Sequence, residues 1–170
     1  MVRVRRVGDF LRICAFGKEL LRVPRPQIPV RRKTPQCKGQ KAMTRILIVD
    51  DDTDLLLLIS GYLVAYGFEV ELAFDVAQAQ SLLERSHFDV IVSDFSMPGG
   101  SGFDLLDYVS LRHPELPFIM MTGLSMPRLK NEAMKRGCCG YLEKPFELKE
   151  LVIAIETAMD FHPMASGLTG

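Results

Sequence analysis

Several short apolar runs in this 170-residue chain end in a residue that could do chemistry. The first run is followed by Asp50 and Asp51, a later one by Asp94, and two more end at Thr122 and at Lys144. Three carboxylates that meet in one crevice repel one another unless a cation lies among them, and Mg²⁺ prefers such hard oxygen ligands. A lysine and a hydroxyl beside that ion could bind the oxygens of a transferring phosphoryl group.

A carboxylate in such a place can itself be the nucleophile and form an acyl phosphate. Asp94 is the best candidate, because it stands alone after its apolar run and a Pro/Gly turn at 97–102 follows. Taken singly, each of these residues has an ordinary structural interpretation as a helix cap or a turn residue. Their shared position after successive apolar runs predicts a site.

Such residues meet only if the runs are parallel strands, whose carboxyl ends lie at one edge of a sheet. Strands are expected at 45–49, 68–73, 88–93, 117–121 and 140–143. Helices are expected at 55–66, 75–86, from the 97–102 turn to about 112, at 125–136 and at 147–160. This alternation predicts an α/β fold with a doubly wound five-stranded parallel sheet.

The charge of the chain divides near Met43. Residues 1–42 hold 12 basic and 2 acidic residues, whereas residues 43–170 hold 9 basic and 19 acidic residues. The proline-rich stretch at 23–29 disfavours regular structure, so we expect a disordered basic leader at 1–43, a folded domain at 44–162 and a flexible tail at 163–170. A transit peptide, an arm for nucleic acid or acidic membrane, and untranslated sequence upstream of a start at Met43 are the alternatives for the leader.

Composition excludes other classes of protein. Hydrophobic residues make up 48% and charged residues 25% of the chain, which is ordinary globular usage. No apolar run reaches the roughly 18 residues that a membrane helix needs. The four cysteines form no CxxC pair, so we expect neither a disulfide framework nor a zinc site, and we expect a reducing, cytoplasmic compartment.

The ordered set of strand-end residues resembles the receiver domain of response regulators in two-component signalling. The matching motifs are Ile-Leu-Ile-Val-Asp-Asp-Asp at 46–52, Asp-Val-Ile-Val-Ser-Asp-Phe-Ser-Met-Pro at 89–98, Met-Thr-Gly at 121–123 and Gly-Tyr-Leu-Glu-Lys-Pro-Phe at 140–146. The resemblance covers residues 44–162 and implies the flavodoxin-like receiver fold with strand order 2-1-3-4-5.

The resemblance also implies a role for each acidic residue. Asp94 would be the phosphoacceptor, taking a phosphoryl group from a histidine kinase or a histidine phosphotransfer protein. Asp51 would bind Mg²⁺ directly, Asp50 mainly through water, and Ser96 through its backbone carbonyl. Ser96 stands where many relatives have Asn, which leaves the lifetime of the phosphoryl group open.

By the same resemblance, Lys144 and Thr122 would bind phosphoryl oxygens, and Tyr141 lies at the aromatic switch position. The peptide bond before Pro145 corresponds to one that is often cis in the family. The surface that changes on phosphorylation would include Lys130, Arg136, Tyr141 and Glu143.

The helix at 55–66 carries no charged residue. Its periodicity predicts a core stripe of Leu55, Leu58, Ile59, Tyr62, Leu63 and Tyr66. This leaves Leu57, Gly61 and Val64 on the outside, a spacing typical of a docking groove for another helix. We expect this face to receive the helical bundle that carries the partner histidine; scattered surface apolar residues are the alternative.

Only ten residues follow Asp160, so we expect no nucleic-acid-binding or enzymatic module there and a separate protein as the target. The resemblance implies a single-domain response regulator that catalyses only its own phosphorylation and autodephosphorylation. Alternatives are a phosphorelay shuttle to a second histidine protein and a receiver detached from a hybrid kinase.

A small Mg²⁺-dependent aspartyl-phosphate phosphatase is a more distant alternative, because Asp54 stands where its motif needs Thr or Val. A flavodoxin-like electron carrier is disfavoured, because the acidic residues at 50–52 would repel the phosphate of its cofactor. A receiver-like scaffold that is not phosphorylated is also disfavoured, because such a protein is expected to have lost one of the site residues.

Overall fold

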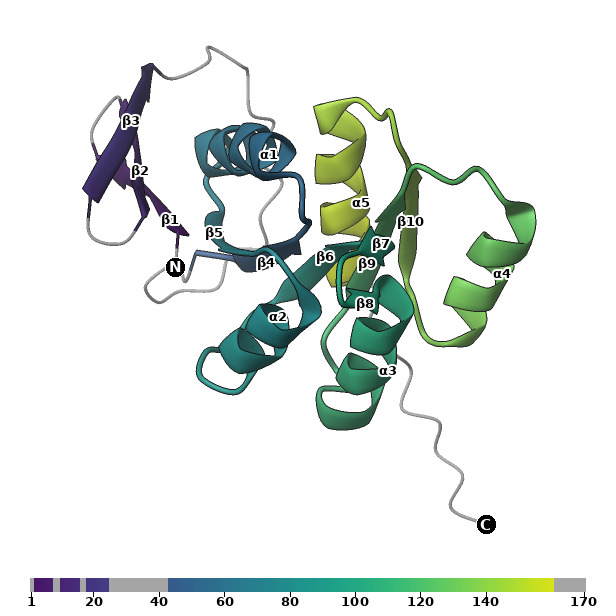
Figure 1. Cartoon of the computed structure of the whole chain (residues 1–170). Helices are drawn as coiled ribbons and strands as arrows, with labels where there is room; N and C mark the ends of the chain where they lie inside the picture. Colours follow the sequence, from purple (N-terminus) through teal and green to yellow (C-terminus); the bar gives the residue numbers. More distant parts are fainter. Residues whose placement is uncertain (1, 8–9, 16–17, 25–42, 161–170) are drawn as a thin grey trace.

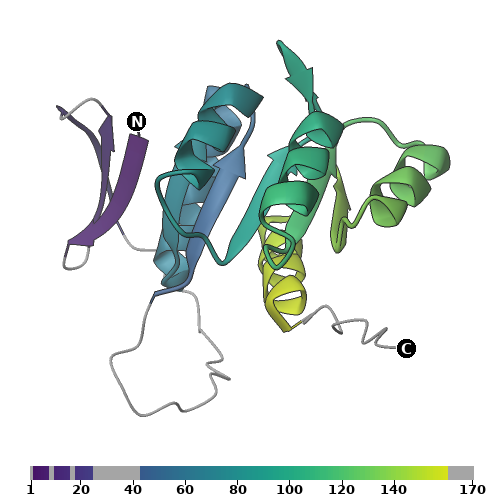
Figure 2. The same cartoon turned by 90° about the horizontal axis from the view of Figure 1, so that it is seen from below.

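The computed structural model describes the backbone of residues 2–7, 10–15, 18–24 and 43–160, and the side chains of residues 43–160 (Figure 1). Among these residues, no helix is both long enough and apolar enough to cross a membrane. The fold is an eight-stranded sheet with helices on both faces of its parallel part, together with a separate two-stranded sheet (Figures 1 and 2).

The centre of the molecule is a parallel sheet of five strands. They are β4 (Arg45–Val49), β5 (Glu69–Ala73), β6 (Val90–Asp94), β9 (Phe118–Thr122) and β10 (Gly140–Glu143). The strands lie side by side in the order β5-β4-β6-β9-β10, and every neighbouring pair is parallel. This is the predicted order 2-1-3-4-5, and the expected strand boundaries are correct to within two residues.

Five helices connect the strands and cover both faces. They are α1 (Thr53–Tyr66), α2 (Val76–Leu83), α3 (Gly102–Arg112), α4 (Pro127–Lys135) and α5 (Leu148–Asp160). Successive side chains of a strand point to opposite faces of the sheet, so β4 contributes residues to both hydrophobic cores. Ile46 and Ile48 pack with α1 and α5, whereas Leu47 and Val49 pack with α2 and α3.

Helix α1 packs through a different face from the predicted one. Its buried residues are Leu56, Ile59, Ser60, Leu63 and Val64. Leu58, predicted in the core, is 59% exposed, whereas Val64, predicted on the outside of the helix, is 1% exposed. Leu57 and Gly61 are half-buried. Because almost every position of this helix is apolar, its sequence pattern does not determine which face packs.

Three further strands precede the parallel sheet, and the expectation of a disordered leader did not include them. They are β1 (Val2–Val7), β2 (Phe10–Ala15) and β3 (Lys18–Pro24), which pair antiparallel in sequence order. β1 also pairs antiparallel with β5, with Arg3 opposite Glu71 and Val4 opposite Val70. Apolar and basic residues alternate at positions 2–5, a pattern typical of strands. The rest of the expected leader and the expected 163–170 tail lie outside the described residues.

Candidate functional site

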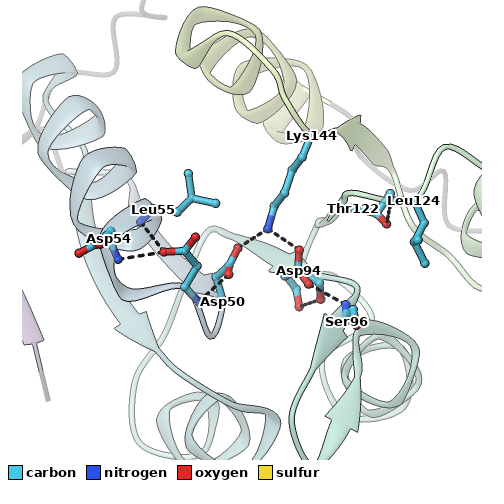
Figure 3. Close-up of polar contacts among 10 residues, drawn as sticks. Asp50, Asp54, Leu55, Asp94, Ser96, Thr122, Leu124 and Lys144 are labelled. Atoms are coloured by element: carbon cyan, nitrogen blue, oxygen red, sulfur yellow. Dashed lines mark hydrogen bonds and ion pairs between the residues drawn. The ribbon is translucent and has the colours of Figure 1, made fainter.

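The residues predicted to do chemistry lie at one edge of the sheet. Asp94 is the last residue of β6 and Thr122 the last residue of β9, while Asp50 directly follows β4 and Lys144 directly follows β10. The strands are parallel and in register, so their carboxyl ends bring together residues that are up to 94 positions apart in the chain. Figure 3 shows the side chains of Asp50, Asp94 and Lys144 converging there.

Lys144 bridges the two buried carboxylates of the site (Figure 3). Its Nζ lies 2.7 Å from Asp50 Oδ2 and 2.5 Å from Asp94 Oδ1. Asp50 is only 1% exposed and Asp94 only 5%. Two carboxylates are therefore held out of water against a single ammonium group.

The electrostatics of this group are unbalanced. Burial raises the pKa of Asp50, and the nearby charge of Asp94 acts in the same direction; the hydrogen bonds from Lys144 and from the Asp52 amide oppose them. Burial also works against the charged form of Lys144, but its hydrogen bonds to both carboxylates outweigh that and raise its pKa. Asp51, the next residue after Asp50, is exposed, so the carboxyl ends of β4 and β6 carry three acidic residues and Lys144 contacts two of them.

The third acid of the 50–52 run has a structural role. Asp52 Oδ1 accepts hydrogen bonds from the amides of Asp54 and Leu55, each at 3.0 Å, and so caps α1. The Asp52 amide in turn donates to Asp50 Oδ1 at 2.9 Å. The start of α1 and the orientation of the Asp50 carboxylate therefore depend on the same turn.

The second oxygen of Asp94 is held by the following loop. The Ser96 amide donates to Asp94 Oδ2 at 2.6 Å. Ser96 belongs to a two-residue strand, β7 (Ser96–Met97), that pairs antiparallel with β8 (Gly100–Ser101). The 97–102 segment, predicted as a turn, is thus a small hairpin that folds back over the end of β6.

Thr122 is 1% exposed, and its hydroxyl lies beside the Asp50–Lys144–Asp94 group rather than within it (Figure 3). Its Oγ1 accepts a hydrogen bond from the Leu124 amide at 3.0 Å. The Lys144 amide donates to the Thr122 carbonyl at 2.7 Å, which joins the ends of β9 and β10. The peptide bond between Lys144 and Pro145 is cis, as the resemblance implies.

Tyr141 lies on β10 and is half-buried, packed against the core that α2 and α3 share with the sheet. Its hydroxyl is buried without a hydrogen-bond partner among residues 43–160, and burial raises its pKa. Lys130 Nζ lies 5.8 Å from the centre of the Tyr141 ring, and Ser125 donates a 2.8 Å hydrogen bond to Glu143. These contacts connect the end of β9, α4 and β10.

Among residues 43–160, Arg136 makes its ion pairs with α3 and α4 rather than with the strand-end residues. Arg136 pairs with Asp107 at 2.7 Å and with Glu132 at 2.9 Å, and its guanidinium lies 4.6 Å from the centre of the Phe103 ring. Its charge therefore already joins α3 to α4.

Gly102, at the start of α3, is a site neighbour that the sequence analysis missed, because a glycine within a Gly-rich turn has no distinguishing signal.

The residues at this edge fit a hard divalent cation by their chemistry. The described residues contain no preassembled group of three or more His, Cys, Asp or Glu side chains that could hold a metal ion. Lys144 lies between Asp50 and Asp94, yet it neutralises only one of the three carboxylate charges. Oxygen ligands with two uncompensated negative charges are the kind of site that Mg²⁺ occupies.

The sequence matches a known family over most of the described domain. Residues 46–156 match the response regulator receiver domain model. The chain is 36% identical over 124 residues to a probable transcriptional regulator, ycf29, of Cyanophora paradoxa, covering 72% of this chain and 59% of the relative. It is 35% identical to the response regulator protein PilR of Pseudomonas aeruginosa, covering 68% of this chain and 26% of PilR. The chain thus spans less than two thirds of the length of either relative.

Solved structures give the same assignment. A response regulator receiver domain protein from Methanospirillum hungatei superposes with a TM-score of 0.67 at 29% identity, covering 70% of this chain and 95% of that one. The chemotaxis response regulator CheY4 of Vibrio cholerae gives 0.65 at 32% identity, covering 69% and 99%. The family match and the fold agree: the chain belongs to the response regulator receiver domain family, whose members accept a phosphoryl group on an aspartate in two-component signalling.

Proposed function

We propose that Asp94 is the residue that accepts the phosphoryl group, from the phosphohistidine of a histidine kinase or a histidine phosphotransfer protein. A carboxylate oxygen of Asp94 attacks phosphorus, the P–N bond breaks, and the imidazole leaves with the electron pair. The observation that carries the proposal is the buried Asp94 carboxylate, held at one oxygen by Lys144 and at the other by the Ser96 amide. Both contacts orient a nucleophile whose chemistry depends on position and charge.

The surrounding residues have complementary roles in this proposal. Lys144 moves its ammonium contact from Asp94 to an oxygen of the phosphoryl group. The Thr122 hydroxyl already accepts from the Leu124 amide, so its proton is available for a second phosphoryl oxygen. Asp51, Asp94 and the Ser96 carbonyl would hold Mg²⁺, with Asp50 acting mainly through water. The bound ion would neutralise charge that builds up on the phosphoryl oxygens.

The signal would leave through the surface formed by α4 and β10, around Lys130, Tyr141 and Glu143. These residues already contact the end of β9 or one another, so a change at Thr122 has a short route to them. The target would be a separate protein that binds the phosphorylated form, as for a single-domain regulator. A phosphorelay shuttle, which passes the phosphoryl group to a second histidine protein, uses the same Asp94 chemistry and is the alternative.

For the phosphodonor, we propose that the histidine-bearing helical bundle docks on the outer face of α1. Val64 is buried and is not part of that face. The exposed apolar side chain there is Leu58, with Leu57 and Gly61 half-buried nearby. Leu58→Lys should slow transfer from the cognate histidine protein and leave phosphorylation by acetyl phosphate unchanged; an equal rate from the histidine protein would refute this docking face.

The test of Asp94 is the intact mass of the protein after incubation with acetyl phosphate, with and without Mg²⁺. Wild type should gain one Mg²⁺-dependent phosphoryl adduct, Asp94→Asn should gain none, and Asp107→Asn, an exposed carboxylate on α3, should behave as wild type. An adduct that persists in Asp94→Asn would refute the assignment of the phosphoacceptor. A wild type that forms no adduct and binds no beryllofluoride would refute the function itself.

A further inference from the structure

The loop that follows Asp94 closes into a ring at Gly102. The Phe95 amide donates to the Met121 carbonyl at 2.8 Å, and the Gly102 amide donates to the Phe95 carbonyl at 2.7 Å. Between these two contacts the chain forms the β7–β8 hairpin, with Ser96 opposite Ser101. The first residue of α3 is thereby pressed against the backbone of the phosphoacceptor strand.

Only glycine fits at this point of the ring. A Cβ added to Gly102 would lie 2.7 Å from the Asp94 carbonyl oxygen and 2.9 Å from Phe95 Cα. Both distances are well inside van der Waals contact, and both neighbours are backbone atoms that no rotamer change can remove. The backbone of Gly102 does not lie in the left-handed region, so space alone demands glycine here.

A second glycine in the same loop provides the contrast. A Cβ added to Gly100 would lie 2.9 Å from Cγ2 of Val76, the end of a half-buried side chain that can turn aside. Its backbone also lies outside the left-handed region. Alanine at position 100 therefore crowds a side chain, whereas alanine at position 102 displaces the backbone of Asp94 and Phe95.

We infer that Gly102 is a positioning residue for phosphorylation of Asp94, an inference that rests on the function proposed above. Its missing side chain lets the Phe95–Ser96 backbone lie where the Ser96 amide donates to Asp94 Oδ2 at 2.6 Å. The same backbone carries the Ser96 carbonyl, a proposed cation ligand. A shift of Asp94 and Phe95 away from a new Cβ moves the carboxylate relative to Lys144, and a displacement of 1 Å can cost on the order of 100-fold in rate.

The experiment compares Gly102→Ala with Gly100→Ala in the full chain. One readout is the rate of phosphorylation by acetyl phosphate over a range of Mg²⁺ concentrations. The other is the amide chemical shifts of Phe95 and Ser96 by NMR without Mg²⁺ or phosphodonor. Circular dichroism sets a temperature at which all variants are folded, and sucrose is added to every sample if Gly102→Ala needs it.

Gly102→Ala should phosphorylate about tenfold or more slowly than wild type, require more Mg²⁺, and shift the Ser96 amide resonance. Gly100→Ala should stay within about twofold of wild type. Equal rates and equal Ser96 shifts in the two variants would overturn the inference. If wild type itself is not phosphorylated, the proposed function fails, and the Ser96 shift alone then decides whether Gly102 positions this backbone.

Discussion

Replacing Lys144 with methionine should destabilise the protein markedly at neutral pH. Among residues 43–160, its ammonium is the cation within ion-pair distance of Asp50 and Asp94. The two carboxylate oxygens that contact it lie about 5 Å apart or less, and two charges at that distance repel by about 3 kcal/mol at an effective dielectric constant of about 20. Removing one partner of a buried ion pair costs about 3–5 kcal/mol. Since the Lys144 side chain is 23% exposed, we expect a loss of about 2–3 kcal/mol in the free energy of unfolding.

The loss should depend on pH in a defined direction. Burial already raises the pKa of Asp50, and the hydrogen bond from Lys144 lowers it, so removing the lysine raises this pKa further. The folded state then holds a proton that the unfolded state has released, and stability falls as pH rises through the raised pKa. The difference between Lys144→Met and wild type should therefore be small in acid, where Asp50 is protonated, and largest at neutral pH.

Urea unfolding followed by circular dichroism, at pH 4.5 and pH 7.5 with EDTA present, measures both effects. Lys149→Met is the matched control, because this exposed lysine pairs with Glu147 at the protein surface and exposed pairs contribute little. The control should unfold as wild type does at both pH values. If Lys144→Met has wild-type stability at both pH values, Lys144 does not neutralise the two buried carboxylates, and the electrostatic account of the site is wrong.

Three further predictions concern other parts of the chain. Gly61→Ala should stabilise the protein by about 0.5–1 kcal/mol in urea unfolding, because nothing lies within 4 Å of the added Cβ in α1; a destabilised variant would contradict this. Burial raises the pKa of Cys138 to about 11, so iodoacetamide at pH 8 should alkylate it on the order of 100-fold more slowly in the folded than in the urea-unfolded protein, as measured by peptide mass spectrometry. Deleting residues 2–42 should speed amide hydrogen exchange in β5, which loses β1, but not in β10, and should leave acetyl phosphate labelling unchanged; equal exchange in β5 would contradict the β1–β5 pairing.

The parallel sheet and the position of its site could be predicted from the sequence, because both follow from local patterns. Each strand is a short apolar run, and each connecting helix has its own periodicity or cap. Once the strands are parallel, Asp50, Asp94, Thr122 and Lys144 must share an edge whatever the details of packing. Placing these residues at one edge of the sheet therefore requires no knowledge of contacts between residues that are distant in the sequence.

The features that the sequence did not predict depend on packing or on a choice between equivalent patterns. In α1 the apolar residues surround the helix, so only contact with the sheet and α5 selects Leu56 and Val64 over Leu58 for the core. Apolar and basic residues alternate in β1, which is typical of a strand, but the basic composition of this segment and the prolines that follow it favour disorder. The requirement for glycine at position 102 appears only when α3 and the end of β6 are placed together.

The charge at the strand ends explains why Lys144 would contribute both to stability and to the chemistry proposed for Asp94. Asp50, Asp51, Asp94 and Lys144 together carry two uncompensated negative charges, which oppose folding. A phosphoryl group replaces the single charge of Asp94 with about two, so transfer makes the imbalance larger unless a cation is bound. Lys144 can keep its contact with Asp50 while its contact with Asp94 Oδ1 is exchanged for a phosphoryl oxygen. The unphosphorylated and the phosphorylated protein thus both need one positive charge at this position. Arginine has a planar and wider guanidinium group, so Lys144→Arg should preserve the stability of the protein better than it preserves the rate of phosphoryl transfer.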